Sequence, residues 1–364
     1  MKWCYNSCAN IISGYGLTGS LENIHINGNV LIVTAPIFIE NNTLSEIINT
    51  FKDCEFKVYS ENIINPDIGL LDNLKKEYFR RRINYIIAIG GGSVIDTAKV
   101  LSVLLLQAEE VFLSKIFRDG LEVSIVTHIP VIAIPTTSGT GAECTHFATI
   151  WDNDYHKKYS LESIHLLPEY VILEPSLTLN LNWEQTFFTG LDAISHSIES
   201  LWNKNYNPVC RAYAKESIDH IRQAFITVLN DPLDIVSRTK MQIASTLSGM
   251  AINQTKTAIA HSISYPLSSR FKVPHGLASS FTIPSLYNYL QGKQVLDKDS
   301  EKCIQKGVNL INQLPVNEQL KKYVTKEDVI SLCEEMNSPS RFGNFIVQVS
   351  SDDLKTILES SISD

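Results

Sequence analysis

The chain contains, at residues 85–99, the stretch Tyr-Ile-Ile-Ala-Ile-Gly-Gly-Gly-Ser-Val-Ile-Asp-Thr-Ala-Lys. Five apolar residues in a row are typical of a buried parallel strand, and the glycines begin a segment with helical spacing. The surrounding sequence repeats this order of apolar runs and helix-like segments. The other predicted strands are Val30–Thr34, Phe56–Tyr59 and Val131–Ile134, and Gly69–Arg82 is a predicted helix. Strand, helix and strand in repetition predict a doubly wound parallel sheet.

The sequence changes character after about residue 175. Strand-like runs nearly vanish, and long stretches carry apolar residues three and four positions apart, which is typical of helices. These stretches are Thr189–Trp202, Val209–Leu229 and Ser237–Ile252. A length of 364 residues also suits two domains. We therefore predict an α/β domain over residues 1–178 and a mainly helical domain over residues 179–364.

Composition excludes several classes of protein. Lys and Arg number 31 against 39 Asp and Glu, a net charge of −8, so the basic surface that nucleic-acid binding needs is missing. An anionic small substrate stays compatible with a local positive pocket. Seven scattered cysteines without a Cys-x-x-Cys pair indicate reduced thiols. The most apolar run, Val100–Leu106, is far below the roughly 20 residues that span a bilayer. We expect a cytoplasmic protein with neither a membrane nor a nucleic-acid partner.

Two loops favour a bound nucleotide. The glycines at Gly90–Gly92 let the backbone approach a phosphate, the helix amides that follow favour its negative charge, and Ser93 can add a hydroxyl donor. A tight turn without a ligand is the alternative, and the stretch lacks the Gly-x-Gly-x-x-Gly fingerprint. Residues 135–143, Pro-Thr-Thr-Ser-Gly-Thr-Gly-Ala-Glu, form a second polar loop after a strand. Ligands of open α/β sheets bind beyond the carboxyl ends of the strands, where both loops fall.

One aspartate and three histidines suggest a metal site. Asp192 and His196 are four residues apart in a helical stretch, so both side chains can reach one ion. An alternative role for Asp192 is that of a helix-start residue. His261 follows in a stretch of small and apolar residues, and His275 in a Pro-His-Gly turn. One carboxylate with three imidazoles suits a divalent transition metal.

The sequence resembles the iron-containing (type III, metal-dependent) alcohol dehydrogenase family over nearly its whole length. The resemblance rests on four motifs in order: residues 90–99, residues 135–143, Thr-Gly-Leu-Asp-Ala-x-x-His-x-x-Glu at residues 189–199, and His-x13-His-Gly at residues 261–276. It implies a Rossmann-like parallel-sheet N-terminal domain and an all-α C-terminal domain, the fold shared with dehydroquinate synthase-like enzymes. The active site would lie in the cleft between the domains.

The resemblance also assigns residues. The metal ligands of the family fall on Asp192, His196, His261 and His275. The implied cofactor residues are Asn65, Gly91, Gly92, Ser93, Thr136, Thr137 and Lys158. The implied metal is Fe²⁺, which Zn²⁺ could replace by its greater intrinsic affinity, and a homodimer is expected.

Two positions depart from the family pattern. Many members carry Asp after the first strand, where it repels the 2′-phosphate of NADPH. This chain has Ala35 at that position. Both NADPH and NADH are therefore possible cofactors, with a slight preference for NADPH. Many members also carry a second His where this chain has Tyr265. That variant resembles the phosphonoacetaldehyde reductase branch. Nearby Arg270 could meet an anionic tail, because guanidinium suits phosphonate; an ordinary surface charge is the alternative.

The implied reaction is reversible hydride transfer between NAD(P)H and a small aldehyde polarised by the metal, with Tyr265 as one candidate proton donor. We expect an anionic aldehyde such as phosphonoacetaldehyde, which would give 2-hydroxyethylphosphonate. Sulfoacetaldehyde or a neutral short-chain aldehyde is the alternative substrate. A dehydroquinate synthase-like lyase and a nonenzymatic nucleotide-binding module are the alternatives of another class.

Overall fold

The computed structural model describes residues 10–155, 157–337 and 339–362. They form two compact units. The sheet unit comprises the described residues of 7–137 and 142–178, and the helical unit comprises residues 138–141 with the described residues from 179 onward. Cys4, Cys8 and the start of the predicted first domain lie outside the described residues.

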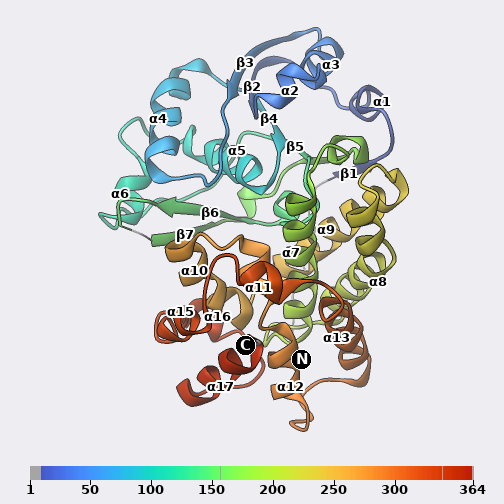
Figure 1. The fold of residues 1–364 in the computed structure, drawn as a ribbon. Helices are drawn as coiled ribbons and strands as arrows, with labels where there is room; N and C mark the ends of the chain where they lie inside the picture. Colours follow the sequence, from blue (N-terminus) through green and yellow to red (C-terminus); the bar gives the residue numbers. More distant parts are fainter. Residues whose placement is uncertain (1–9, 156, 338, 363–364) are drawn as a thin grey trace. The chain divides into compact units, whose positions relative to one another are not determined.

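The sheet unit has a six-stranded parallel sheet in the order β1-β8-β5-β4-β2-β3 (Figure 1). Its strands are β1 (Asn10–Ser13), β2 (Gly28–Thr34), β3 (Cys54–Ser60), β4 (Tyr85–Gly90), β5 (Val131–Pro135) and β8 (Tyr170–Leu173). The four predicted strands are β2 to β5, and the two unpredicted ones, β1 and β8, contain four residues each. The predicted parallel α/β sheet is therefore confirmed.

Helices cover both faces of this sheet because the strands alternate their side chains with a period of two. Leu31 and Val33 of β2 face one apolar cluster, with α4, α5 and α6. Val30 and Ile32 face the other, with α1, α2 and α3. Figure 1 shows these two groups of helices on opposite sides of the sheet. Their bounds are α1 (Leu17–Leu21), α2 (Ile37–Glu40), α3 (Thr43–Thr50), α4 (Ile68–Tyr78), α5 (Gly92–Leu104) and α6 (Leu113–Phe117).

A two-stranded antiparallel hairpin also belongs to the sheet unit and was not predicted. It joins β6 (Phe147–Asp152) to β7 (Lys157–Glu162). The connection from β7 to β8 and the links elsewhere contain short 3₁₀ turns. They are η1 (Phe79–Arg81), η2 (Ala142–Cys144), η3 (Ile164–Leu166) and η4 (Pro175–Thr178). The predicted helix at Gly69–Arg82 corresponds to α4 and η1.

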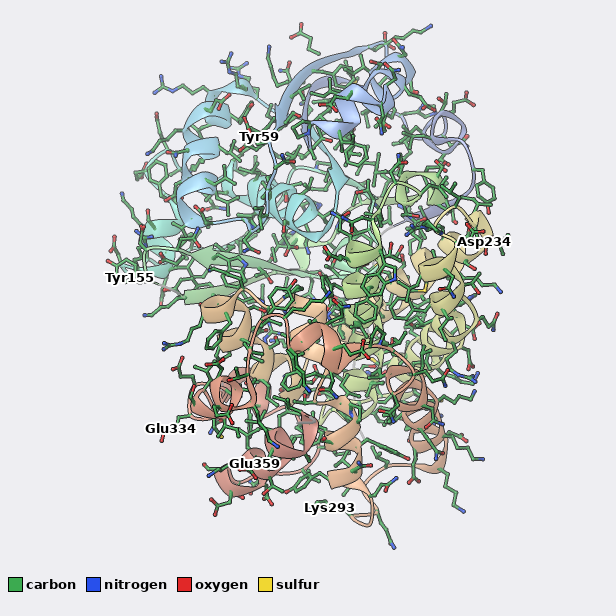
Figure 2. All side chains as sticks on the ribbon, viewed as in Figure 1. Tyr59, Tyr155, Asp234, Lys293, Glu334 and Glu359 are labelled. Atoms are coloured by element: carbon green, nitrogen blue, oxygen red, sulfur yellow. The ribbon has the colours of Figure 1, made fainter. Side chains whose placement is uncertain are left out.

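The helical unit contains no strand among its described residues, as predicted. Its helices are α7 (Trp183–Leu201), α8 (Pro208–Asn230), α9 (Ile235–Thr255), α10 (Ile259–Phe271), α11 (His275–Ser280), α12 (Ile283–Leu290), α13 (Lys298–Ile311), α14 (Val316–Leu320), α15 (Lys326–Ser331), α16 (Pro339–Phe342) and α17 (Ser351–Ser361). One apolar cluster runs through this unit, and α7 contributes residues to it from Phe187 to Leu201. Charged side chains such as Lys293, Glu334 and Glu359 point outward instead (Figure 2). In the described part of the chain, no helix is both long enough and apolar enough to span a bilayer.

Candidate functional site

Helix α7 presents three ionisable side chains on one buried face. Asp192, His196 and Glu199 are spaced by four and three residues, so they lie one above the other along the helix. All three are at least 95% buried. The helix begins at Trp183, capped by the side chain of Asn182, so Asp192 lies well inside it. The alternative role of Asp192 as a helix-start residue is therefore wrong.

Two further helices bring the remaining histidines to Asp192. His261 comes from α10, and His275 is the first residue of α11, where a Pro-His-Gly turn was predicted. The Oδ1 atom of Asp192 lies 3.6 Å from Nε2 of His196, 3.4 Å from Nε2 of His261 and 3.8 Å from Nε2 of His275. These separations suit donors around one ion, since ligands about 2.0–2.1 Å from zinc lie roughly 3.4 Å apart in a tetrahedral shell.

The closest set comprises three of the four predicted ligands. One ligand atom from each of Asp192, His261 and His275 lies within 4.8 Å of the other two. His196 lies beside this set: its Nε2 atom is 3.6 Å from Oδ1 of Asp192, and its ring stacks on that of His261 with 4.7 Å between the ring centroids.

A glycine allows α11 to come this close to α7. A Cβ atom at Gly276 would lie 1.8 Å from the backbone oxygen of Phe188, which no real side chain tolerates. The neighbouring His275 therefore owes its place beside Asp192 to the absence of a side chain at residue 276. Here the glycine permits close backbone packing rather than an unusual φ angle.

Glu199 controls the orientation of His261. One of its carboxylate oxygens lies 2.6 Å from Nδ1 of His261, and the backbone amides of Ala258 and Ala260 donate to the carboxylate at 2.9 and 2.6 Å. A proton on Nδ1 donated to Glu199 leaves the lone pair of Nε2 for a ligand. Sequence reasoning included Glu199 in a motif but assigned it no role; its position seven residues after Asp192 was the available signal.

The polar atoms of the cluster fit a divalent cation. Nε2 of His261 is buried and has no hydrogen-bond partner in the described part of the chain, and a buried polar atom left this way is costly. A metal ion would satisfy it. The donor set of one carboxylate and three imidazoles suits Fe²⁺ or Zn²⁺.

Electrostatics agree with a cluster that binds positive charge. Burial alone would raise the pKa of Asp192, but the neighbouring histidines outweigh it and hold that pKa well below its usual value. Burial lowers the pKa of His196 to about 4, so this imidazole is neutral at pH 7. A charged carboxylate beside a neutral imidazole is the state that metal ligation needs.

Tyr265 stands beside the cluster, whereas Arg270 is engaged elsewhere. The Tyr265 ring stacks on that of His275 with 6.3 Å between centroids and 8° between planes. Burial raises the pKa of Tyr265, so the phenol keeps its proton at neutral pH. Arg270 instead forms an exposed ion pair with Glu335, with nitrogen–oxygen distances of 2.9 and 2.7 Å. Of the two roles considered for Arg270, the structure therefore favours that of an ordinary surface charge.

The glycine-rich turn lies at the carboxyl end of β4. Gly91 precedes the first residue of α5, and the amide of Thr136 donates to the carbonyl of Gly90 at 3.0 Å. A Cβ atom at Gly91 would come within 3.3 Å of the Thr137 side chain. The turn and the second loop thus form a cradle that a side chain at Gly91 would fill. Gly91 and Gly92 form the N-terminus of α5, and main-chain amides at a helix N-terminus suit a phosphate.

A chain of contacts links this turn to the segments that carry the other predicted cofactor residues. The Ser93 hydroxyl donates to the carbonyl of Ile64 at 2.7 Å, next to Asn65. The carbonyl of Pro66 accepts a hydrogen bond from the amide of Trp151 at 2.8 Å. The ammonium of Lys158 lies 5.2 Å from a ring centroid of Trp151. One expectation changes: the Ser93 hydroxyl ties the Asn65 loop to the turn instead of pointing its proton at a ligand.

The glycines of the second loop serve packing within the helical unit. A Cβ atom at Gly139 would lie 2.6 Å from the Cβ atom of Thr189, and one at Gly141 would lie 2.4 Å from the Cα atom of Gly249. Residues 138–141 accordingly belong to the helical unit. Their glycines are explained by contact with α7 and α9, and only Thr136 and Thr137 remain with the turn.

Lys99, at the end of the turn motif, is a structural residue. Its ammonium is fully buried and donates to the Thr145 hydroxyl at 2.9 Å and to the carbonyls of Ala142 and Phe147 at 3.0 and 2.5 Å. Asp96 lies 3.2 Å from this ammonium and accepts from the amide of Thr149 at 2.8 Å. The Asp-x-x-Lys part of the motif therefore holds α5 against η2 and β6.

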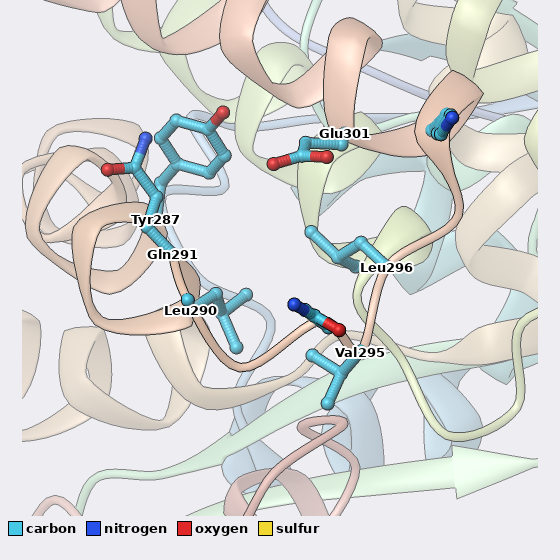
Figure 3. A pocket seen from close by; sticks show the side chains of 9 residues that line it. Tyr287, Leu290, Gln291, Val295, Leu296 and Glu301 are labelled. Carbon is cyan, nitrogen blue, oxygen red and sulfur yellow. The ribbon is translucent and has the colours of Figure 1, made fainter.

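A separate pocket of about 290 Å³ lies at the connection between α12 and α13 (Figure 3). Tyr287, Leu290 and Leu296 form its apolar wall, and Glu301 lies at its rim. The described residues that line it include none of the predicted ligand or cofactor residues. This pocket therefore does not belong to the candidate site.

The fold and the cluster together define a class of protein: a parallel α/β unit with a glycine-rich turn, and a helical unit with a His-rich metal-binding cluster. Family models agree in both halves. The model of the iron-containing alcohol dehydrogenases matches residues 8–175, and that of the C-terminal part of the Fe-containing alcohol dehydrogenase family matches residues 186–364. The chain belongs to the iron-containing alcohol dehydrogenase family.

Individual relatives support this membership. A sulfoacetaldehyde reductase of Bilophila wadsworthia is 34% identical over 242 residues, which are 65% of this chain and 60% of the relative. Alcohol dehydrogenase 4 of Saccharomyces cerevisiae is 29% identical over 64% of this chain and 60% of its own length. The matched part of the chain thus spans about three fifths of these two curated relatives.

The fold is also shared with solved structures. A sulfoacetaldehyde reductase from Bifidobacterium kashiwanohense in complex with NAD⁺ superposes with a TM-score of 0.87 at 23% identity, over 100% of this chain and 99% of that one. At this identity the likeness shows the fold. It confirms the predicted Rossmann-like parallel sheet followed by a helical part.

Proposed function

We propose that this protein is a metal-dependent, NAD(P)H-linked alcohol dehydrogenase that reduces a small aldehyde reversibly. The observation that carries the proposal is the cluster of Asp192, His261 and His275 with a buried, unpartnered imidazole nitrogen. Bound there, a divalent ion would supply a Lewis acid, and a nicotinamide cofactor would supply the hydride. Family membership supports the same reaction.

In the overall reaction, an aldehyde, NAD(P)H and one proton are converted to an alcohol and NAD(P)⁺. A new C–H bond forms at the carbonyl carbon, and the carbonyl oxygen gains a proton. Asp192 and the three histidines would hold the metal, and the turn at Gly91 and Gly92 would bind the diphosphate of the cofactor through its amides. Tyr265 holds a proton on its phenol oxygen beside His275. Asp192, His196 and His261 are buried, which strengthens the electrostatic interactions among them.

The substrate we propose is a small anionic aldehyde, phosphonoacetaldehyde or its analogue sulfoacetaldehyde. Tyr265 supports this choice, since it replaces the second histidine that many members of the family carry. The name of the Bilophila wadsworthia relative, a sulfoacetaldehyde reductase, favours the sulfonate. A neutral short-chain aldehyde is the competing substrate, and the alcohol dehydrogenase names of other relatives favour it.

Metal and cofactor are further parts of the proposal. Fe²⁺ is proposed as the resident metal, with Zn²⁺ able to occupy the same donors. NADPH is proposed with NADH as the alternative, because Ala35 directly follows β2 and carries no charge to repel a 2′-phosphate. A cytoplasmic homodimer stays a prediction.

A substrate and cofactor grid tests the proposal. The purified, iron-loaded full chain is assayed with NADH and with NADPH against phosphonoacetaldehyde, sulfoacetaldehyde, lactaldehyde, butanal and succinic semialdehyde. We expect one mole of reduced cofactor oxidised per mole of aldehyde, fastest with an anionic two-carbon aldehyde. A lyase that recycles bound NAD would consume no added cofactor. Cofactor binding without any metal-dependent turnover would identify a nonenzymatic nucleotide-binding module instead.

A further inference from the structure

Arg341 is a cation beside the metal-binding cluster that the predicted site did not include. It lies on the short helix α16, and its Cζ atom is 5.4 Å from the centroid of the Tyr265 ring. The Tyr265 ring in turn stacks on the ring of His275. The ring of Tyr265 therefore contacts both this guanidinium and a proposed metal ligand.

Several contacts hold Arg341 in place. Its Nη1 atom donates to the hydroxyl of Thr257, and Asn344 donates to the Thr257 carbonyl at 2.9 Å. The segment after α16 is bound to the loop that follows α7, because the amide of Lys204 donates to the carbonyl of Asn344 at 2.8 Å. The next residue, Phe345, is fully buried. Arg341 is thus a positioned group on an anchored segment.

The charge of Arg341 is not neutralised within the described part of the chain, where it has no ion-pair partner. Arg270 provides the contrast, since Glu335 occupies its guanidinium. A guanidinium carries five N–H donors, and the Thr257 hydroxyl accepts from one nitrogen of Arg341. Donors and a full positive charge therefore remain for an anionic ligand.

We infer that Arg341 binds the anionic group of the substrate, a tetrahedral sulfonate or phosphonate on a small aldehyde. The inference rests on the proposed function and adds the residue that selects this substrate class. The fork of a guanidinium matches two oxygens of such a group. A single carbon separates the carbonyl from the sulfur or phosphorus, so the anion must bind close to the metal. Arg341 supplies a cation against the ring of Tyr265, which itself stacks on the proposed ligand His275.

The test separates anion binding from a structural role through paired substrates. Arg341→Gln keeps an amide that can donate to Thr257 and removes the charge; Arg270→Gln is the matched control at an exposed ion pair. The assays use iron-loaded enzyme. We expect Arg341→Gln to lower kcat/KM for sulfoacetaldehyde and phosphonoacetaldehyde about 10- to 100-fold, mainly by raising KM. This is the size of effect expected when charge-assisted hydrogen bonds to a ligand are lost. Propanal should change less than about threefold, and Arg270→Gln should change none of the three. Comparing sulfonate with phosphonate in wild type identifies the preferred anion.

A binding measurement makes the inference testable without turnover. Ethanesulfonate carries the anion and no carbonyl, so calorimetry on wild type and Arg341→Gln measures recognition of the anion alone. We expect binding by wild type that weakens at least about tenfold in the variant. The inference would be overturned if kcat/KM fell equally for propanal and for the anionic aldehydes. It would also be overturned if the variant bound ethanesulfonate as tightly as wild type. A wild type that reduces propanal but binds no sulfonate would overturn it too and leave the reductase proposal intact. Binding without any aldehyde reduction would refute the proposed function alone.

Discussion

The glycine-rich turn of the sheet unit and the His-rich cluster of the helical unit form their sites in opposite ways. The turn would bind its proposed ligand through the backbone, which requires the absence of side chains, as at Gly91, where a Cβ atom would crowd Thr137. The cluster offers side chains from α7, α10 and α11, brought together by helix packing. A backbone site is readable in one short stretch, whereas a side-chain site depends on how distant segments pack.

The largest effect is expected for His261→Ala, which removes one ligand of the cluster. Turnover should fall more than about 100-fold. Loss of a residue that only hydrogen-bonds to a metal ligand typically costs about 10- to 100-fold, and loss of a ligand itself should cost more. NADPH binding, measured by fluorescence, should stay within about twofold of wild type because the turn is built from other residues. Metal analysis of the same sample completes the measurement. Full activity in a verified metal-free variant would refute the metal site.

Glu199→Gln should weaken the metal site without removing a ligand. The neutral amide loses the charged hydrogen bond to Nδ1 of His261, so metal affinity should fall about 10- to 100-fold, measured by competition with a chelator. The control is Glu335→Gln, an exposed carboxylate paired with Arg270. Unchanged metal affinity together with lower thermal stability would show that Glu199 only anchors the amides of α10.

Gly91→Ala tests the backbone site in the same way. The new Cβ atom would lie 3.3 Å from the Thr137 side chain, which must move to make room for it. Overpacking costs about 1–3 kcal/mol, and if this cost falls on the cofactor-bound state, cofactor binding weakens roughly 5- to 150-fold. Gly19→Ala is the matched control, since nothing lies within 4 Å of its Cβ position. Metal content should not change. If Gly91→Ala lowered metal content as much as cofactor affinity, the two sites would not be independent.

The smallest effect is expected for Ala35→Asp. A carboxylate after β2 repels a 2′-phosphate, and like charges near a protein surface interact by about 1–4 kcal/mol at 4 Å. KM for NADPH should therefore rise at least about fivefold, while KM for NADH stays the same or falls. Steady-state kinetics with both cofactors measures this ratio. If Ala35→Asp left KM for NADPH unchanged, the ribose that carries the 2′-phosphate would not lie near residue 35.

Local signals predicted much of the fold and part of the site. The strands β2 to β5 were predicted because long apolar runs are typical of buried parallel strands. The strands β1 and β8 were missed because each has only four residues. The β6–β7 hairpin was missed because Thr149 interrupts the apolar residues of β6, and because β7 begins and ends with the charged residues Lys157 and Glu162. The spacing of Asp192 and His196 predicted their shared helix face.

What the sequence by itself determined is the alternation of elements, the glycine-rich turn and the candidate ligands, because each is written within one strand, turn or helix. Only the tertiary structure decided which distant side chains meet. It placed Glu199 on His261, paired Arg270 with Glu335, and set Arg341 over Tyr265. It also decided that Gly139 and Gly141 serve helix packing. The physical reason is that such contacts depend on how whole helices pack, and the periodicity of one segment carries no information about the residues that another segment brings to it.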